Sequence, residues 1–187
     1  MRKMLLAPLL MMALVAACRS EPALAPDVED TVERALEARG LKDVSVGQDR
    51  EKGIVTLTGK VQNEAQKAEA ASIAQSIAGS QVVANQIAVE PAGNEGVASD
   101  VNEALDDGID SNMKALLLKV TNKDNKDDVT YSVKNAVVTL KGSVASQARR
   151  TEIEQAAAGV PNVKQVVNEL EVKGQRATTR GGGGGND

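Results

Sequence analysis

Residues 53–61 read GIVTLTGKV, and residues 136–144 read AVVTLKGSV. The two stretches align at an offset of 83 residues, and the alignment continues without a gap to Val89 and Val172. Sequence similarity that extends without a gap along a whole segment indicates an internal repeat, in which one supersecondary unit occurs twice. The chain therefore contains two related structural units.

The repeated stretches have the alternating pattern of β-strands. Val55, Leu57 and Val61 lie an even number of positions apart, so their side chains lie on one face of a strand. We expect this face to be buried, with Leu57 in one core and its counterpart Leu140 in the other. Both strands are predicted to be half-buried.

A helix and a further strand follow each repeated stretch. Asn63 and Ser146 are N-cap candidates, because their side chains can accept a hydrogen bond from a backbone N–H of the first turn. Each precedes an apolar row with the period of a helix that buries one face: Ala70, Ile73, Ala74 and Ile77 in the first copy, and Ile153, Ala156, Ala157 and Val160 in the second. The strands that follow, at 83–89 and 166–172, alternate again.

A helix and a strand also precede each repeated stretch. The expected ranges are 28–39 and 44–46 in the first copy, and about 101–120 and 129–133 in the second. Gly40 ends the first helix as a C-terminal cap. The order helix, strand, strand, helix, strand predicts an α+β fold with two tandem domains, at residues 27–90 and 107–173. Residues 91–106 are expected to contain a linker and the start of a helix, and residues 174–187 a disordered glycine-rich tail.

The N-terminus has the pattern of an export signal. Arg2 and Lys3 precede an apolar run from Met4 to Val15, which is too short to span a bilayer as a helix. The run ends in Val-Ala-Ala-Cys, which resembles the bacterial lipobox, where small residues precede a lipidated cysteine. That cysteine is Cys18.

The lipobox resemblance implies a processed and lipid-anchored protein. Residues 1–17 would be removed as a signal peptide, Cys18 would be lipidated, and residues 18–26 would tether the first domain to a membrane. Because neither Arg19 nor Ser20 resembles the Asp that marks inner-membrane retention in Gram-negative lipoproteins, we expect the outer membrane, with the protein facing the periplasm. The alternative is an ordinary cleavage site, which leaves Cys18 as a free thiol and the chain soluble in the periplasm.

The composition argues against most kinds of catalysis. The chain has no His, Phe or Trp, and it has one Tyr and one Cys. Without His it lacks the usual general base and the commonest metal ligand. The net charge of −4 is also unlike that of a general nucleic-acid binder, which is basic. We therefore expect no enzyme activity, no cofactor, no metal and no nucleic-acid partner.

Several polar residues have structural explanations. The acidic residues around Asp124 resemble a calcium loop, but an EF-hand starting there would need Gly and Glu at positions where the chain has Val and Asn. A solvated loop is the interpretation we favour. Asp106, Asp107 and Asp110 are expected to interact with a helix N-terminus and not to act as an acid/base set. Asn85 and Asn168 are expected to hold a loop by hydrogen bonds.

The motifs G-x-V-x-L-x-G-x-V and V-x-N-x-L-x-V, the second read from VVNELEV at 166–172, resemble the BON domain family. The resemblance covers about 27–90 and 107–173, and it implies that each domain is a three-stranded mixed sheet covered by two helices. The chain differs from the family at one hairpin, where Asn135-Ala136 replaces the usual Gly. It also lacks aromatic residues on the second domain's helix, where the resemblance would place residues that insert into a membrane.

Tandem BON domains behind a lipobox resemble outer-membrane lipoproteins that bind anionic phospholipid and help to maintain the envelope. The resemblance therefore implies a non-catalytic envelope lipoprotein that binds anionic phospholipid or a membrane-proximal partner, such as another envelope protein, and supports outer-membrane integrity. Soluble relatives are periplasmic stress proteins. The alternative is accordingly a periplasmic osmotic-stress protein with chaperone-like activity.

The charge distribution indicates where an anionic lipid would bind. Basic residues outnumber acidic residues in the range 128–174, whereas acidic residues outnumber basic ones in the range 27–90. Basic groups near an anionic membrane surface are attracted to it. We therefore expect lipid contact in the second domain, at Lys141, Arg149, Arg150 and Lys164. The alternative for the two arginines is surface pairing with glutamates on the same helix, Arg149 with Glu152 and Arg150 with Glu154.

Overall fold

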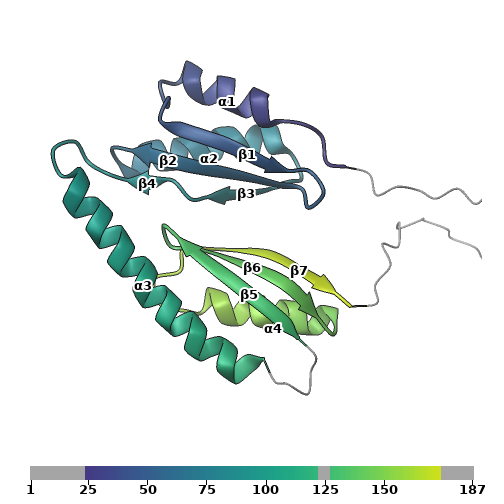
Figure 1. Ribbon diagram of the computed structural model, residues 1–187. Helices are drawn as coiled ribbons and strands as arrows, with labels where there is room; N and C mark the ends of the chain where they lie inside the picture. The colour runs from purple at the N-terminus through teal and green to yellow at the C-terminus, as the bar shows by residue number, and fades with distance from the viewer. Residues whose placement is uncertain (1–23, 122–126, 174–187) are drawn as a thin grey trace, which may run out of the picture.

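The computed structural model describes residues 24–121 and 127–173, which form two α+β domains in sequence (Figure 1). The first domain contains α1 (Glu29–Ala38), β1 (Val44–Asp49), β2 (Ile54–Val61), α2 (Glu64–Ala78), β3 (Val82–Asn85) and β4 (Ala88–Val89). The second contains α3 (Glu95–Val120), β5 (Asp128–Lys134), β6 (Val137–Val144), α4 (Gln147–Ala158) and β7 (Gln165–Val172). The predicted tandem α+β organisation is confirmed.

Each domain has a mixed sheet with the strand of the repeated motif in the middle. β2 pairs antiparallel with β1 and parallel with β3 and β4, and β6 pairs antiparallel with β5 and parallel with β7. Short turns join the antiparallel strands, while α2 and α4 make the crossovers that parallel pairing requires. Equivalent residues pair in both sheets: Val55 lies opposite Val83, and Val138 lies opposite Val166.

The helices of each domain cover one face of its sheet, and a core of aliphatic side chains lies between them. Leu57 and Leu140 are fully buried, as the alternation predicts. The first core includes Val32, Leu36, Val55, Leu57, Val61, Ala70, Ala74 and Ile87. The second includes Ile109, Met113, Leu117, Val138, Leu140, Val144, Ile153 and Ala157.

The predicted N-caps are confirmed. Asn63 Oδ1 accepts a hydrogen bond from the backbone N–H of Gln66 (2.9 Å), and Ser146 Oγ accepts one from the backbone N–H of Arg149 (3.3 Å). Each bond satisfies an amide that has no partner within its helix. These caps fix where α2 and α4 begin, one residue after the cap in each domain.

The glycine shared by the two copies is required by a close backbone contact. Gly59 and Gly142 lie within β2 and β6 at φ of +108° and +113°. A Cβ atom at either position would lie 2.0 Å from a carbonyl oxygen, that of Asp43 or that of Asp128. Only glycine therefore allows the neighbouring strand to approach at this point.

α3 begins earlier than the sequence predicts. It starts at Glu95, so most of the expected linker at residues 91–106 is helical. Glu95 Oε1 accepts a hydrogen bond from the backbone N–H of Gly93 (2.8 Å). Its carboxylate also lies in the first turn, where a negative charge interacts favourably with the helix dipole. These contacts explain why the helix extends through Gly96.

The third strand is continuous only in the second domain. β7 is unbroken, whereas two residues separate β3 from β4. Asn85 Nδ2 donates to the backbone oxygen of Lys67 in α2 (3.1 Å), and Asn168 Nδ2 donates to Glu154 Oε2 in α4 (2.8 Å). Both asparagines therefore connect a strand to a helix. Asn85 Oδ1 also accepts from the backbone N–H of Ile87 in the break between β3 and β4 (3.4 Å), so the expected loop contact is present at Asn85, whereas Asn168 accepts from Leu170 within β7.

The two sheets pack against each other through the faces that carry no helices (Figure 1). Ile54, Ala84, Val137 and Val167 are buried there as a separate apolar cluster. Ile54 and Val137 are equivalent in the repeat, as are Ala84 and Val167, so each domain contributes the same two positions. The prediction that β2 and β6 are half-buried is wrong at these positions, because the other domain covers the second face.

Candidate functional site

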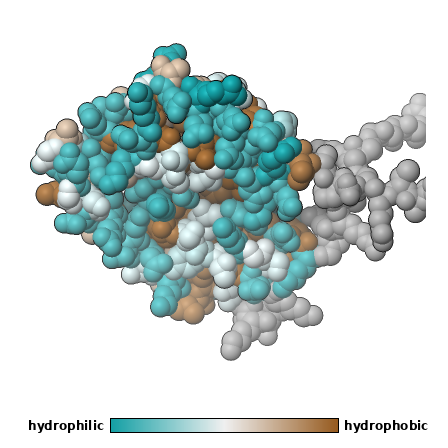
Figure 2. All heavy atoms as spheres, turned by 45° about the horizontal axis from the view of Figure 1, so that its top comes forward, coloured by the Kyte–Doolittle hydropathy of each residue, from teal (hydrophilic) through white to brown (hydrophobic). Residues whose placement is uncertain are grey.

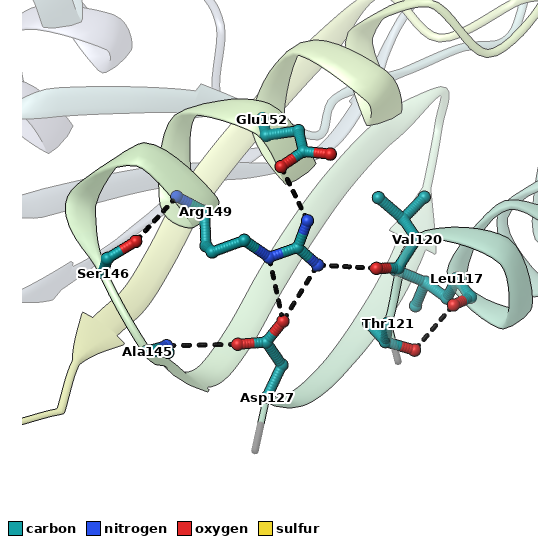
Figure 3. A network of polar contacts seen from close by, with 8 residues as sticks. All are labelled: Leu117, Val120, Thr121, Asp127, Ala145, Ser146, Arg149 and Glu152. Atoms are coloured by element: carbon teal, nitrogen blue, oxygen red, sulfur yellow. Dashed lines mark hydrogen bonds and ion pairs between the residues drawn. The ribbon is translucent and has the colours of Figure 1, made fainter. Parts of the chain in front are cut away.

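Arg149 lies in the first turn of α4, and its side chain bridges three parts of the second domain (Figure 3). Nε and Nη2 both donate to Asp127 Oδ2, at 3.1 and 2.9 Å. Nη2 also donates to the backbone oxygen of Val120 at the end of α3 (2.5 Å), and Nη1 donates to Glu152 Oε2 (2.6 Å). The guanidinium group therefore already has protein acceptors, and the pairing with Glu152 is present.

Asp127 is the centre of this network. Its side chain is fully buried, and its second oxygen, Oδ1, accepts a hydrogen bond from the backbone N–H of Ala145 (3.1 Å). The Arg149 side chain is 17% exposed, and its hydrogen bonds to Asp127 are the main reason that the pKa of Arg149 lies above the usual value. The pair connects the segment before β5 with the end of α3 and the start of α4, which is a structural role.

Arg150 has different neighbours. Its Nη2 donates to the backbone oxygen of Asn168 (3.1 Å). Its Nε is shielded from solvent and has no hydrogen-bond partner among the described residues. Glu154, the expected partner, accepts from the side chain of Asn168 instead. Arg150 is thus half-buried against β7.

The two lysines of the predicted lipid site are more exposed than the arginines. Lys141 lies on β6 beside a polar cavity of about 260 Å³ between the sheets. Lys164 Nζ pairs with Glu64 Oε1 of α2 (3.1 Å), and both side chains are exposed. Lys164 lies beside Ala136 at the start of β6, whereas Arg149 lies at its other end. The four cations therefore do not form one surface.

A glutamine of the second domain binds the backbone of the first. Gln165 Oε1 accepts a hydrogen bond from the N–H of Asn85 (3.0 Å), and its Nε2 donates to the oxygen of Val83 (2.7 Å). The side chain therefore pairs with β3 in the way that a further strand would. The contact therefore gives hydrogen-bond partners to backbone groups on the edge of β3.

Two further polar contacts between the domains involve equivalent pairs of positions in the two repeat copies. Lys52 Nζ pairs with Glu169 Oε2 (2.5 Å), and Asn135 Nδ2 donates to the backbone oxygen of Gln86 (2.7 Å). Lys52 and Asn135 are equivalent positions, as are Gln86 and Glu169. The interface therefore has approximate two-fold character. Sequence reasoning missed it, although apolar residues recur at equivalent outward positions of both copies.

The role of Asp106 differs from the expected one. Since α3 starts at Glu95, Asp106 lies within the helix and not at its N-terminus. Its Oδ2 accepts from the N–H of Asn135 (2.7 Å), and its Oδ1 accepts from the N–H of Ala136 (2.8 Å). These two residues form the β5–β6 turn at φ of +49° and +65°, a conformation that costs non-glycine residues energy. The carboxylate therefore holds a turn that lacks glycine.

Two sequence predictions concern residues that the structure does not describe. Cys18 and Asp124 lie outside the described ranges. Within residues 24–121 and 127–173, no three side chains of His, Cys, Asp or Glu lie close enough together to hold a metal ion. No helix in the same ranges combines the length and hydropathy of a membrane span.

The first half of α3 has an exposed apolar row. Val97, Val101 and Leu105 are spaced four residues apart and are 67, 52 and 41% exposed. The same spacing continues to Ile109 and Met113, which are fully buried in the second core. Figure 2 shows a mainly hydrophilic surface interrupted by apolar patches. We call Val97, Val101 and Leu105 the α3 apolar row.

Comparison with known proteins identifies a family and a related protein. The family model of the BON domain matches residues 25–91 and 105–174. The chain is 36% identical over 134 residues to osmotically-inducible protein Y of Escherichia coli strain K12. That match covers 70% of this chain and 62% of the relative, so the chain spans about three fifths of the relative's length.

Among solved structures, two of CdsD, a structural protein of the type III secretion system of Chlamydia trachomatis, are 18% identical to this chain. They cover 76% of it, and the match covers 66% and 62% of those chains. The TM-score of 0.27 in both cases is too low to support a shared arrangement.

Proposed function

The chain belongs to the BON domain family, and we propose that it is a non-catalytic osmotic-stress protein of the bacterial envelope with chaperone-like activity. The similarity to an osmotically inducible protein supports the stress role. The export signal in the sequence supports a location in the periplasm. The functional surface in this proposal is the α3 apolar row.

The α3 apolar row has the properties of a surface for unfolded chains. Its three side chains are the apolar face of a helix that continues into the second core but is left uncovered in its first half. Apolar side chains that stay in water gain free energy when another apolar segment covers them, at roughly 25 cal/mol per Å². Because the row is short, we expect weak and reversible binding of exposed apolar segments.

An aggregation assay tests this proposal. The full chain should reduce light scattering from a heat-denatured client protein, and a Val97→Asp/Val101→Asp variant should lose most of that effect. Leu118→Asp is the matched control, because Leu118 is 78% exposed near the other end of the same helix. Equal protection by the double variant and wild type would contradict the proposed surface. In cells, the protein level should rise after an osmotic upshift.

We also propose that the mature chain is held at the outer membrane through lipidated Cys18, a proposal that the lipobox-like sequence supports. Contact with anionic phospholipid stays a prediction. The variant that tests it is Lys141→Glu, because Lys141 is exposed whereas both arginines donate to protein acceptors. Weaker cosedimentation with phosphatidylglycerol vesicles at low salt is the expected result.

A further inference from the structure

A cleft of about 220 Å³ lies where α3 passes between the two domains. The first domain contributes the start of α2 and the segment around β4, and the second contributes the β5–β6 turn and the loop before β7. Val89, Leu105 and Val163 are partly or largely exposed and give the cleft an apolar wall, and Lys67 and Asn102 line it with polar groups. The site therefore combines apolar and hydrogen-bonding surface, as small-molecule sites do.

The carboxylates at the cleft are already engaged. Both oxygens of Asp106 accept backbone N–H groups of the β5–β6 turn. Glu64 accepts from the ammonium group of Lys164. A ligand that enters the cleft consequently finds few free acceptors on these side chains.

The donors at the cleft are not all engaged. Lys67 is half-buried, and none of the ion pairs or side-chain hydrogen bonds of the described residues involves its ammonium group. Burial, and secondarily the charge of Lys164, lower the pKa of Lys67, while Glu64 and Asp106 oppose this shift. Asn102 Nδ2 is shielded from solvent and has no partner among the described residues. Shielded donors without partners cost free energy that a ligand acceptor would recover.

The charge balance selects the kind of acceptor. Lys67 and Lys164 are the cations of the cleft, and Glu64 and Asp106 are its anions, so its lining is close to neutral. A group with a single negative charge can bind Lys67 without strong repulsion from the two carboxylates, whereas a dianion would be repelled more. A carboxylate meets this condition better than a phosphate monoester does.

We propose that this interdomain cleft binds a small aliphatic carboxylate, whose oxygens accept hydrogen bonds from Lys67 and Asn102 and whose chain packs against Val89, Leu105 and Val163. Such a ligand would touch both domains and α3, so its binding would stabilise their relative placement. This inference goes beyond the proposed chaperone-like activity. It depends on the polar side chains of Lys67 and Asn102, which are not part of the α3 apolar row.

Titration of the full chain followed by two-dimensional NMR tests the proposal, with hexanoate as the probe. Saturable shifts of amides around the cleft are expected. Lys67→Gln and Asn102→Leu should each weaken binding at least fivefold, and hexanol should bind at least tenfold more weakly than hexanoate. Lys114→Gln is the control, because Lys114 is an exposed lysine of α3 that does not line the cleft.

Three outcomes would overturn the proposal. One is equal binding of hexanoate and hexanol, because the ammonium group would then have no role. Another is unchanged hexanoate affinity in Lys67→Gln, whose fold is checked by its thermal midpoint. The third is a set of shifts confined to the amides of Val97 and Val101, which do not line the cleft. Because the titration needs no client protein, its result is separate from that of the aggregation assay.

Discussion

Replacing Arg149 by Glu should destabilise the second domain strongly. The change removes the hydrogen bonds to Asp127, Glu152 and the end of α3, and it places a new carboxylate beside the fully buried side chain of Asp127. Loss of one partner from a buried ion pair costs about 3–5 kcal/mol. Since the Arg149 side chain is 17% exposed, we take the lower end, about 3 kcal/mol. This is a large fraction of the roughly 5–15 kcal/mol that stabilises an ordinary domain.

Urea denaturation followed by circular dichroism measures the effect. Lys141→Glu is the control, because it makes the same charge change at an exposed position of the same domain, and a shift below about 0.5 kcal/mol is expected. Arg149→Lys should have an intermediate effect, because lysine keeps the charge but cannot reproduce the fork of donors. If Arg149→Glu and Lys141→Glu unfold at the same urea concentration, the reasoning about this network is refuted.

Gly59→Ala should cost several kcal/mol, because its Cβ would lie 2.0 Å from the Asp43 oxygen, whereas Gly47→Ala, with nothing within 4 Å, should change the melting temperature little. Burial, and secondarily a hydrogen bond to α3, raise the pKa of Tyr131 to about 12, so the protonated phenol is favoured in the folded state. The stability from this group is complete below pH of about 10 and lost as pH rises towards about 12. Ultraviolet titration of this single tyrosine checks the pKa, and an ordinary midpoint near 10 would contradict it. Cys18→Ala should release the protein from membranes after fractionation, and retention after a salt wash would count against the lipid anchor.

The repeat allowed most of each domain to be predicted, because strand alternation, helical spacing and caps are local signals. Asn63 and Ser146 are clear examples, since a cap depends on a bond only three residues away. The second buried face of β2 and β6 was missed because Ile54 and Val137 have no local partner there. Their partners come from the other copy of the repeat.

The candidate site was harder to predict for the same reason. Arg149 follows a cap and precedes Glu152, so its helical pairing is visible in the sequence. Its bonds to Asp127 and Val120 join segments more than twenty residues apart, and no periodicity reveals them. Counting charges therefore selected both arginines as candidate lipid contacts. In the structure, their guanidinium groups already donate hydrogen bonds to protein acceptors.

The approximate two-fold contact between the sheets resembles the interface of a symmetric homodimer, in which one patch meets a copy of itself. Joining both halves in one polypeptide makes their association unimolecular, at an effective concentration in the millimolar range for short linkers. The pairing therefore does not weaken on dilution, as that of two separate chains would. Fusion also frees each half to diverge, and the contact shows this: a lysine–glutamate pair at one end corresponds to an asparagine–backbone bond at the other.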